Sequence, residues 1–276
     1  MLNILFEDQS IIVAEKPVGL ESQATRKLEP DMVSEIRKHI HKLSTSASGK
    51  RGEPYVGVIH RLDRPVGGIM VYAKTKEAAA ALSRQVQDRT MEKYYLAIVC
   101  GKPVDNVGNF VDFLLKDGKI NSSFVVDKTT DGAKRAELEY RVINSGVLDG
   151  REVSLAEVHL LTGRHHQIRV QFASRGLPLW GDEKYGNREK KSESGEETGQ
   201  NGGSEPVLPA RTGVRTGVPA GSGARTGRRR MPSGRETPAL YAFRLEFRHP
   251  VTGEVMKFEK WPETGAFRRY EEQTRF

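Results

Sequence analysis

The chain has 276 residues, of which 37% are hydrophobic and 29% are charged, and this is enough to bury one substantial core. It has no apolar run near the roughly 18 residues that a membrane helix needs, and its one cysteine, Cys100, excludes an internal disulfide framework and a thiolate zinc cluster. The formal net charge of +8 does not by itself indicate nucleic-acid binding, because residues 188–235 hold ten basic and five acidic residues and leave the rest only mildly basic.

The first part of the chain predicts strands and helices in irregular alternation. Thr75 stands immediately before a run of strong helix formers and is in position to cap that helix. Residues 93–101 carry bulky side chains on both faces, so we expect a central strand there. The elements expected in this part are a strand over 10–17, a helix through Val33, Ile36, Ile40 and Leu43, a strand over 67–75, a helix over 76–89 and a strand over 93–101.

Two alternating runs follow, over 135–145 and 151–163, and they are typical of antiparallel neighbours joined by a turn at 146–150. Residues 164–176 place Ile168 and Phe172 four apart, which predicts a helix with Gly176 at its end. Strands in runs with helices between them indicate an α+β fold with a mixed, mainly antiparallel sheet.

Residues 188–235 are rich in Gly, Ser, Thr, Pro and Arg and have almost no large apolar side chains, so we expect this segment to be disordered. Two strand-like runs, 240–250 and 254–262, come after it. A two-stranded hairpin is marginal alone, so these strands should complete a sheet begun before the insertion. We therefore expect a discontinuous domain over 1–187 and 236–276, interrupted by the insertion 188–235.

Several common catalytic motifs are absent from the sequence. It has no phosphate-binding G-x-x-x-x-G-K-[ST] loop and no G-x-S-x-G esterase motif, and the order of its H-R-L-D segment is not that of a kinase loop. His165 and His166 are adjacent and lack the spacing of paired metal ligands. What remains is a pair of arginine-rich turns, at 57–68 and 162–169.

The first turn places Asp63 between Arg61 and Arg64. An aspartate held ionised beside an arginine can act as a nucleophile or a base. The same residues could instead form a structural ion pair that joins two loops. The residues alone leave both interpretations open.

A set of motifs in this chain resembles the RluA-type family of RNA pseudouridine synthases, and it covers almost all of the chain outside the insertion. The resemblance implies a pseudouridine synthase fold with a mixed, mainly antiparallel sheet, flanking helices and a central cleft. The motifs are EDQSIIVAEKPVGL (7–20), HRLDRPVGGIMVYAKT (60–75), KYYLAIVCG (93–101), LLTGRHHQIRV (160–170), GDEKYG (181–186) and LYAFRLEFRHPVTGE (240–254).

Carried over to this sequence, the resemblance implies that Asp63 is the catalytic aspartate and that Tyr95 stacks on the target base. It also implies that Arg164 is catalytic and pairs with Asp63, so that the ion pair and the nucleophile would be the same object. The positions expected to contact RNA or substrate are His60, Arg61, Arg64, Lys93, His166, Gln167 and Arg169.

The chain also departs from the family pattern. Val66, Gly67 and Gly68 stand where the family commonly has Thr-Ser-Gly, so two hydroxyls are lost beside the site. His165 replaces a usual Thr, and Tyr241 replaces a common His. The chain starts almost at its first motif, so we expect no small RNA-binding S4 domain before it.

The resemblance implies isomerisation of specific uridines in rRNA or tRNA to pseudouridine, with the base flipped into the cleft. That reaction requires no nucleotide, metal or organic cofactor, and the expected partner is RNA. The acidic residues near the N-terminus are not those of a signal peptide, and we expect a cytoplasmic protein, monomeric by default and without a membrane partner. The insertion could add phosphate contacts or could simply be tolerated at the surface. The alternatives for the whole chain are a catalytically idle RNA-binding or ribosome-assembly protein, and a hydrolase that uses the aspartate.

Overall fold

A computed structural model describes residues 2–24, 29–45, 53–186, 236–263 and 265–274. The predicted disorder of 188–235 lies outside the described residues. The residues before and after that segment, 1–186 and 236–276, belong to one compact unit.

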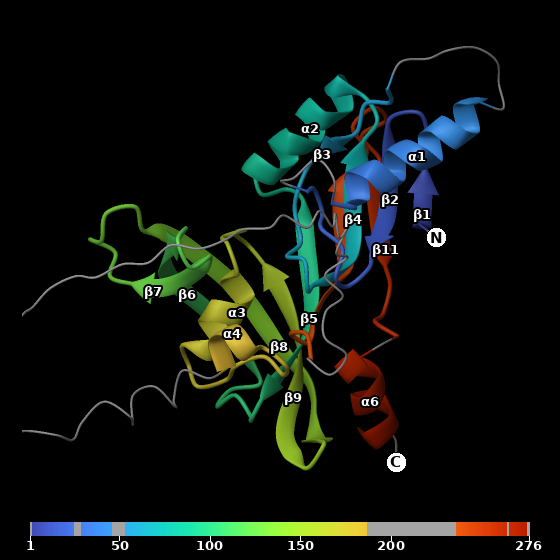
Figure 1. The fold of residues 1–276 in the computed structure, drawn as a ribbon. Coiled ribbons are helices and arrows are strands. Elements are labelled where there is room, and N and C mark those ends of the chain that lie inside the picture. Colours follow the sequence, from blue (N-terminus) through green and yellow to red (C-terminus); the bar gives the residue numbers. More distant parts are fainter. Residues whose placement is uncertain (1, 25–28, 46–52, 187–235, 264, 275–276) are drawn as a thin grey trace, which may run out of the picture. The chain divides into compact units, whose positions relative to one another are not determined.

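The core of this unit is a sheet of eleven strands among the described residues, in the order β1-β2-β4-β10-β5-β9-β8-β6-β7, with β3 paired to β4 and β11 paired to β10 (Figure 1). All of the pairings are antiparallel except that of β10 with β4. The predicted mixed, mainly antiparallel sheet is therefore confirmed. The strands are β1 (Asn3–Glu7), β2 (Ile11–Lys16), β3 (Gly57–Val58), β4 (Gly67–Ala73), β5 (Glu92–Cys100), β6 (Val107–Asp117), β7 (Ser122–Val126), β8 (Lys134–Leu148), β9 (Arg151–Leu160), β10 (Leu240–Arg248) and β11 (Val255–Glu259).

The helices lie against this sheet. Thr75 caps α2 as predicted, because its side chain accepts a hydrogen bond from the Ala78 amide. Figure 1 shows α3 and α4 next to each other beside β8, and α1 and α2 near β2 and β4. No described helix is both long enough and apolar enough to span a membrane. The helices are α1 (Met32–Thr45), α2 (Lys76–Gln87), α3 (Gln167–Ala173), α4 (Glu183–Gly186) and α6 (Gly265–Thr274).

Two strand predictions have direct outcomes in the sheet. The strand β5 is central, between β10 and β9, and β10 lies between β4 and β5, so residues beyond the insertion complete the sheet as expected.

The predicted turn at 146–150 is too long, because β8 continues to Leu148. The turn itself is Asp149-Gly150, whose φ angles of 47° and 78° suit a tight two-residue hairpin.

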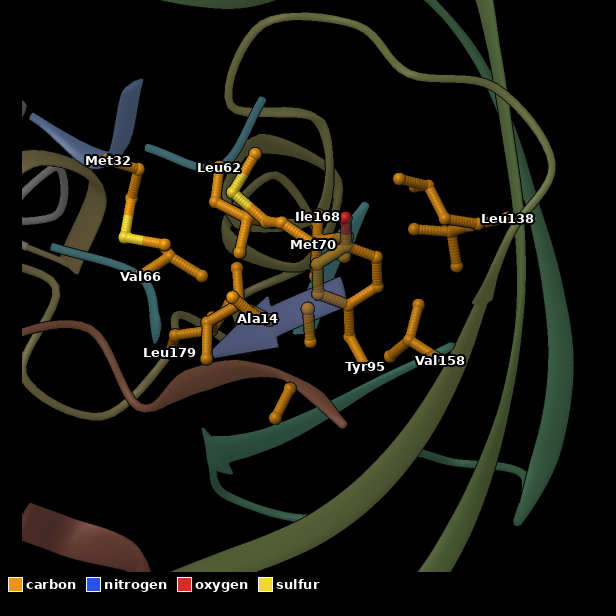
Figure 2. Close-up of a cluster of buried hydrophobic side chains, with 14 of the residues drawn as sticks. Ala14, Met32, Leu62, Val66, Met70, Tyr95, Leu138, Val158, Ile168 and Leu179 are labelled. Atoms are coloured by element: carbon orange, nitrogen blue, oxygen red, sulfur yellow. The ribbon is translucent and has the colours of Figure 1, made fainter. Parts of the chain in front are cut away.

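One hydrophobic cluster packs beneath the two arginine-rich turns. Figure 2 shows Leu62, Val66 and Ile168 in this cluster together with Met70 and Tyr95. Leu62 and Val66 flank Asp63, and Ile168 precedes Arg169, so burial of these apolar neighbours holds the charged residues at fixed positions. The core thus positions the site.

Candidate active site

Asp63 lies in the loop between β3 and β4, with its side chain 29% exposed. The loop is held by the Val66 amide, which donates to the Asp63 carbonyl at 2.9 Å. The Ser22 hydroxyl also donates to the Leu62 carbonyl at 2.8 Å and accepts from the Leu62 amide at 3.0 Å. The carboxylate therefore stands on an anchored loop and remains accessible.

Arg169, in α3, is the cation that pairs with Asp63. Its Nη1 lies 3.3 Å from Asp63 Oδ2, and its Nε and Nη2 donate to the two Asp182 oxygens at 2.7 and 2.8 Å. The Asp182 side chain has no exposed surface and that of Arg169 is 6% exposed. Burial alone would lower the pKa of Arg169, but the Asp182 hydrogen bonds and charge, with that of Asp63, raise it instead. Arg169 is thus a fixed positive charge held between two carboxylates.

The prediction that Arg164 pairs with Asp63 is wrong. The Arg164 Nε donates to the Arg135 carbonyl at 2.9 Å, and its side chain is exposed at the pocket wall. Arg164 belongs to the turn before α3, whereas Arg169 belongs to the buried helix itself. Both arginines were candidates for the ion pair with Asp63 from the sequence alone. Only the path of the turn shows that the partner is Arg169.

His166 forms a further contact with Asp63. Its Nε2 lies 3.3 Å from Asp63 Oδ2, and its Nδ1 lies 2.7 Å from the Tyr185 hydroxyl. Burial, followed by the charge of Arg169, lowers the pKa of His166 to about 3, so the ring is neutral near pH 7. The residue has a φ of 54°, an uncommon conformation that His tolerates better than most side chains.

Tyr95 and Asp63 line one pocket of about 90 Å³, together with Arg61, Arg164, His166, Gln167 and Arg169. Tyr95 is only 6% exposed, and Figure 2 shows its ring inside the hydrophobic cluster. Burial, and then the charge of Asp63, raises the pKa of the Tyr95 hydroxyl, so the ring stays neutral. An aromatic ring and the Asp63–Arg169 pair thus meet in a single pocket.

The remaining predicted contact residues divide into four groups. His60 is not among the lining residues of that pocket; its Nε2 accepts from the Val71 amide at 3.3 Å. Arg61 and Arg64 donate to the Gln23 side chain and the Gly19 carbonyl, at 3.2 and 3.1 Å. Gln167 holds the turn before α3, because its Oε1 accepts from the Arg164 amide at 3.0 Å. Lys93 lines a second pocket beside the first.

Sequence reasoning missed Asp182, Tyr185 and Lys16 as individual site residues. The first two belong to the GDEKYG motif, which was the available signal. Lys16 is fully buried at the end of β2, and its Nζ donates to the carbonyls of Pro17, Leu20 and Arg64 at 3.1, 2.7 and 3.3 Å. Burial lowers its pKa to about 8. Lys16 therefore joins the segment after β2 to the Asp63 loop.

The departure at residues 66–68 is accommodated by close packing against β10. A Cβ atom at Gly67 would lie 3.2 Å from the Tyr241 ring, and one at Gly68 would lie 2.3 Å from the Ala242 carbonyl oxygen. Gly68 has a φ of 132°, which also favours glycine. The Tyr241 hydroxyl donates to Glu15 at 2.7 Å. Gly67 and Tyr241, two positions where the resemblance implied a departure, are therefore direct neighbours.

Comparison with solved structures places this fold among the pseudouridine synthases. The structure titled Human RNA Pseudouridylate Synthase Domain Containing 4 aligns with a TM-score of 0.64 at 20% identity, over 98% of this chain and 92% of that one. Human RNA Pseudouridylate Synthase Domain Containing 1 aligns with a TM-score of 0.65 at 18% identity, over 95% and 84%. At these identities the likeness establishes the fold.

Sequence comparison then establishes the family. A family model described as RNA pseudouridylate synthase matches residues 10–174, so the chain belongs to that family, as the RluA-type motifs implied. An uncharacterized RNA pseudouridine synthase of Aquifex aeolicus is 36% identical over 186 residues, which are 67% of this chain and 56% of that protein.

The ribosomal large subunit pseudouridine synthase D of Pseudomonas aeruginosa is 32% identical over 262 residues, 94% of this chain and 67% of that protein. The chain thus spans between about half and two thirds of the length of these relatives.

Proposed function

We propose that this protein is an RNA pseudouridine synthase that converts specific uridines in RNA to pseudouridine, with Asp63 as the catalytic carboxylate. The observation that carries the proposal is the position of Asp63 in a pocket of this family's fold, beside Tyr95 and paired with the buried Arg169. A hydrolase finds less support, because the pocket offers no second carboxylate as acid or base among its lining residues.

The reaction breaks the bond from uracil N1 to ribose C1′, rotates the uracil and rejoins it through C5. No group enters or leaves and no electron is transferred, so the balance needs no co-reactant. Asp63 must act in its ionised form, either by adding to the nucleoside or by removing a proton from it. Arg169, held by Asp182, places a positive charge 3.3 Å from the Asp63 carboxyl oxygen.

The target base must leave its stack to reach this pocket, at a cost of a few kcal/mol. An aromatic surface returns roughly 1 to 3 kcal/mol per base. Tyr95 is the tyrosine among the described lining residues of the pocket, and we assign it the stacking role. His166 and Arg164 form the part of the wall that the extruded nucleotide meets.

Ribosomal RNA is the substrate that we favour over transfer RNA. The support is the name of several relatives, such as those of Pseudomonas aeruginosa and Zymomonas mobilis, which are ribosomal large subunit pseudouridine synthases. The alternative is a catalytically idle RNA-binding protein that retains the fold.

The test is transcriptome-wide mapping of pseudouridine by carbodiimide-dependent reverse-transcription stops. We compare cells that carry the wild-type protein, a deletion, Asp63→Asn, or the matched control Asp131→Asn at an exposed loop position. We expect the same one or few stops to vanish in the deletion and in Asp63→Asn, and to persist in the control. An unchanged map with the protein expressed would refute the synthase and favour the idle RNA-binding protein.

A further inference from the structure

A second pocket adjoins the Asp63 pocket and has no role in the mechanism above. Its volume is about 380 Å³, within the range of small-molecule binding sites. Leu160, Gly163 and Arg164 line both pockets, so the two are neighbours along one wall.

Lys93 is the central feature of this second pocket. It stands two residues before Tyr95 in β5, so the two side chains point to the same face of the sheet, about 7 Å apart along the strand. That spacing is close to the reach from a base to the phosphate of its own nucleotide. A Cβ atom at Gly163 would lie 3.9 Å from Lys93 Nζ, which places the ammonium at the boundary of the two pockets.

The Lys93 ammonium has no hydrogen-bond or ion-pair partner in the part of the chain that the structure describes. Most of its side chain is nevertheless withdrawn from solvent, and burial lowers its pKa. A poorly solvated, unpaired ammonium at a pocket wall has its favourable partner in an anion supplied by a ligand.

The charges of the pocket wall also favour an anion. Its two carboxylates are already engaged, since Glu92 bonds to His159 and Glu137 pairs with Arg135 at 2.5 Å. The basic side chains of Arg89 and Arg164 have no carboxylate partner among the described residues. The net charge that the wall of the second pocket presents to a ligand is therefore positive.

We propose that this second pocket binds the nucleotide next to the target uridine, with the connecting phosphodiester on Lys93. The inference rests on the proposed function, because it takes the target base to be in the Asp63 pocket. A strand that enters both pockets is held by stacking at Tyr95 and by charge at Lys93. The site therefore recognises at least two consecutive nucleotides.

The test is a binding cycle that combines a protein variant with a modified RNA. The probe is the pentanucleotide CCUCC, whose single uridine fixes the register. Three forms are compared: one with all phosphodiesters charged, one with a neutral methylphosphonate on the 5′ side of the uridine, and one with a neutral methylphosphonate on its 3′ side. Full-length chain carrying Asp63→Asn serves as the background, so that the RNA is held without conversion. Fluorescence anisotropy gives the dissociation constants of this chain and of its Lys93→Met, Lys93→Arg and Lys102→Met derivatives.

We expect Lys93→Met to weaken binding of the charged pentamer about tenfold, as loss of a charge-assisted hydrogen bond does. One of the two methylphosphonates should weaken binding equally, and should have no further effect in Lys93→Met. The salt dependence of log Kd should also fall by about 0.7. Lys93→Arg should retain the affinity. Lys102→Met, exposed beyond the opposite end of β5 and roughly 30 Å away, should behave as the background chain.

Additive effects of Lys93→Met and both methylphosphonates, or equal affinities of the Lys93→Met and Lys102→Met chains, would overturn the second pocket as a phosphate site. Pseudouridine formation is measured separately by the mapping described above. An absence of any converted uridine refutes the synthase, whereas conversion together with an additive cycle refutes only the second pocket.

Discussion

At the scale of single residues, the site depends on Arg169, which forms ion pairs with Asp182 on one side and Asp63 on the other. The inner carboxylate has no exposed side-chain surface, so removal of the arginine leaves an uncompensated buried charge. The outer carboxylate faces the pocket, where we propose that the chemistry takes place. On that proposal, one guanidinium contributes both to stability and to activity.

We predict that Arg169→Met lowers the free energy of unfolding by about 3 to 5 kcal/mol, because it leaves the buried Asp182 carboxylate without its ion-pair partner. Arg164→Met, at an exposed position, should change it by less than about 1 kcal/mol. Urea denaturation followed by circular dichroism measures both values. Equal losses in the two variants would contradict the assignment of Arg169 as the structural partner.

The neutral state of His166 predicts a dependence of stability on pH. Its folded pKa of about 3 lies below the ordinary value of 6.5, so the unfolded chain binds more protons between these two values. Its contribution to stability is thus fully present above about pH 6.5 and is lost as the pH falls toward 3. His60, whose pKa burial and then Lys93 lower to about 3, acts in the same direction.

We therefore expect His166→Asn to reduce the slope of unfolding free energy against pH by up to about 1.4 kcal/mol per pH unit between pH 6 and 4. Asn retains an acceptor near Nδ1 and tolerates the positive φ. A His166→Asn slope equal to that of the wild type would show that the ring binds protons equally in the folded and unfolded chains, which would contradict the lowered pKa.

At the scale of elements, β4 and β10 meet at two glycines, of which Gly68 has no room for a side chain and Gly67 has little. Gly67 faces Tyr241 across the parallel pairing, and Gly68 faces the Ala242 backbone. The two departures that the resemblance implied at positions 67 and 241 therefore occupy one contact. The tyrosine ring fills space beside Gly67.

We predict that Gly67→Ser destabilises the protein by about 1 to 3 kcal/mol, because the new side chain overpacks against the Tyr241 ring. Combination with Tyr241→His should recover part of that loss, so the two effects should not be additive. Thermal or urea unfolding of the two single variants and the double variant measures the coupling. Additive losses would mean that the two positions vary independently.

At the scale of the whole molecule, we propose that residues 1–187 and 236–276 form one discontinuous catalytic domain and that 188–235 is an insertion into it. The described residues on the two sides of the insertion meet directly, since the Ala239 amide donates to the Trp180 carbonyl at 2.8 Å. A Cβ atom at Gly181 would also lie 2.5 Å from the Thr237 carbonyl oxygen. The chain thus leaves and re-enters the sheet at nearly the same place.

Replacement of 188–235 by a Gly/Ser linker of about eight residues should therefore leave the midpoint of thermal unfolding within about 3 °C of the wild-type value, since loop closure depends weakly on loop length. If the arginines of this segment contact RNA, the same deletion should lower the salt dependence of RNA binding. Calorimetry and binding at several salt concentrations separate the two effects. A loss of cooperative unfolding would show that the segment is part of the folding unit.

The elements of this fold were largely readable from local pattern. The strands predicted over 10–17, 67–75 and 93–101 are found at Ile11–Lys16, Gly67–Ala73 and Glu92–Cys100, and Thr75 caps its helix, because hydrophobic period and capping chemistry act over a few neighbours. The α+β class, the completion of the sheet by β10 and β11, and the position of Asp63 in a loop also followed from the sequence. Its motifs carried the family as well.

Tertiary structure decided which charges meet. Arg169 and Asp63 are 106 residues apart and Arg169 and Asp182 are 13 apart, so no local pattern could select Arg169 over Arg164 or reveal the buried carboxylate behind it. The same holds for the contact of Gly67 with Tyr241 and for Lys93 at the boundary of two pockets. These features depend on the path of loops between distant strands, and an ion pair forms only where that path brings the two groups within about 4 Å.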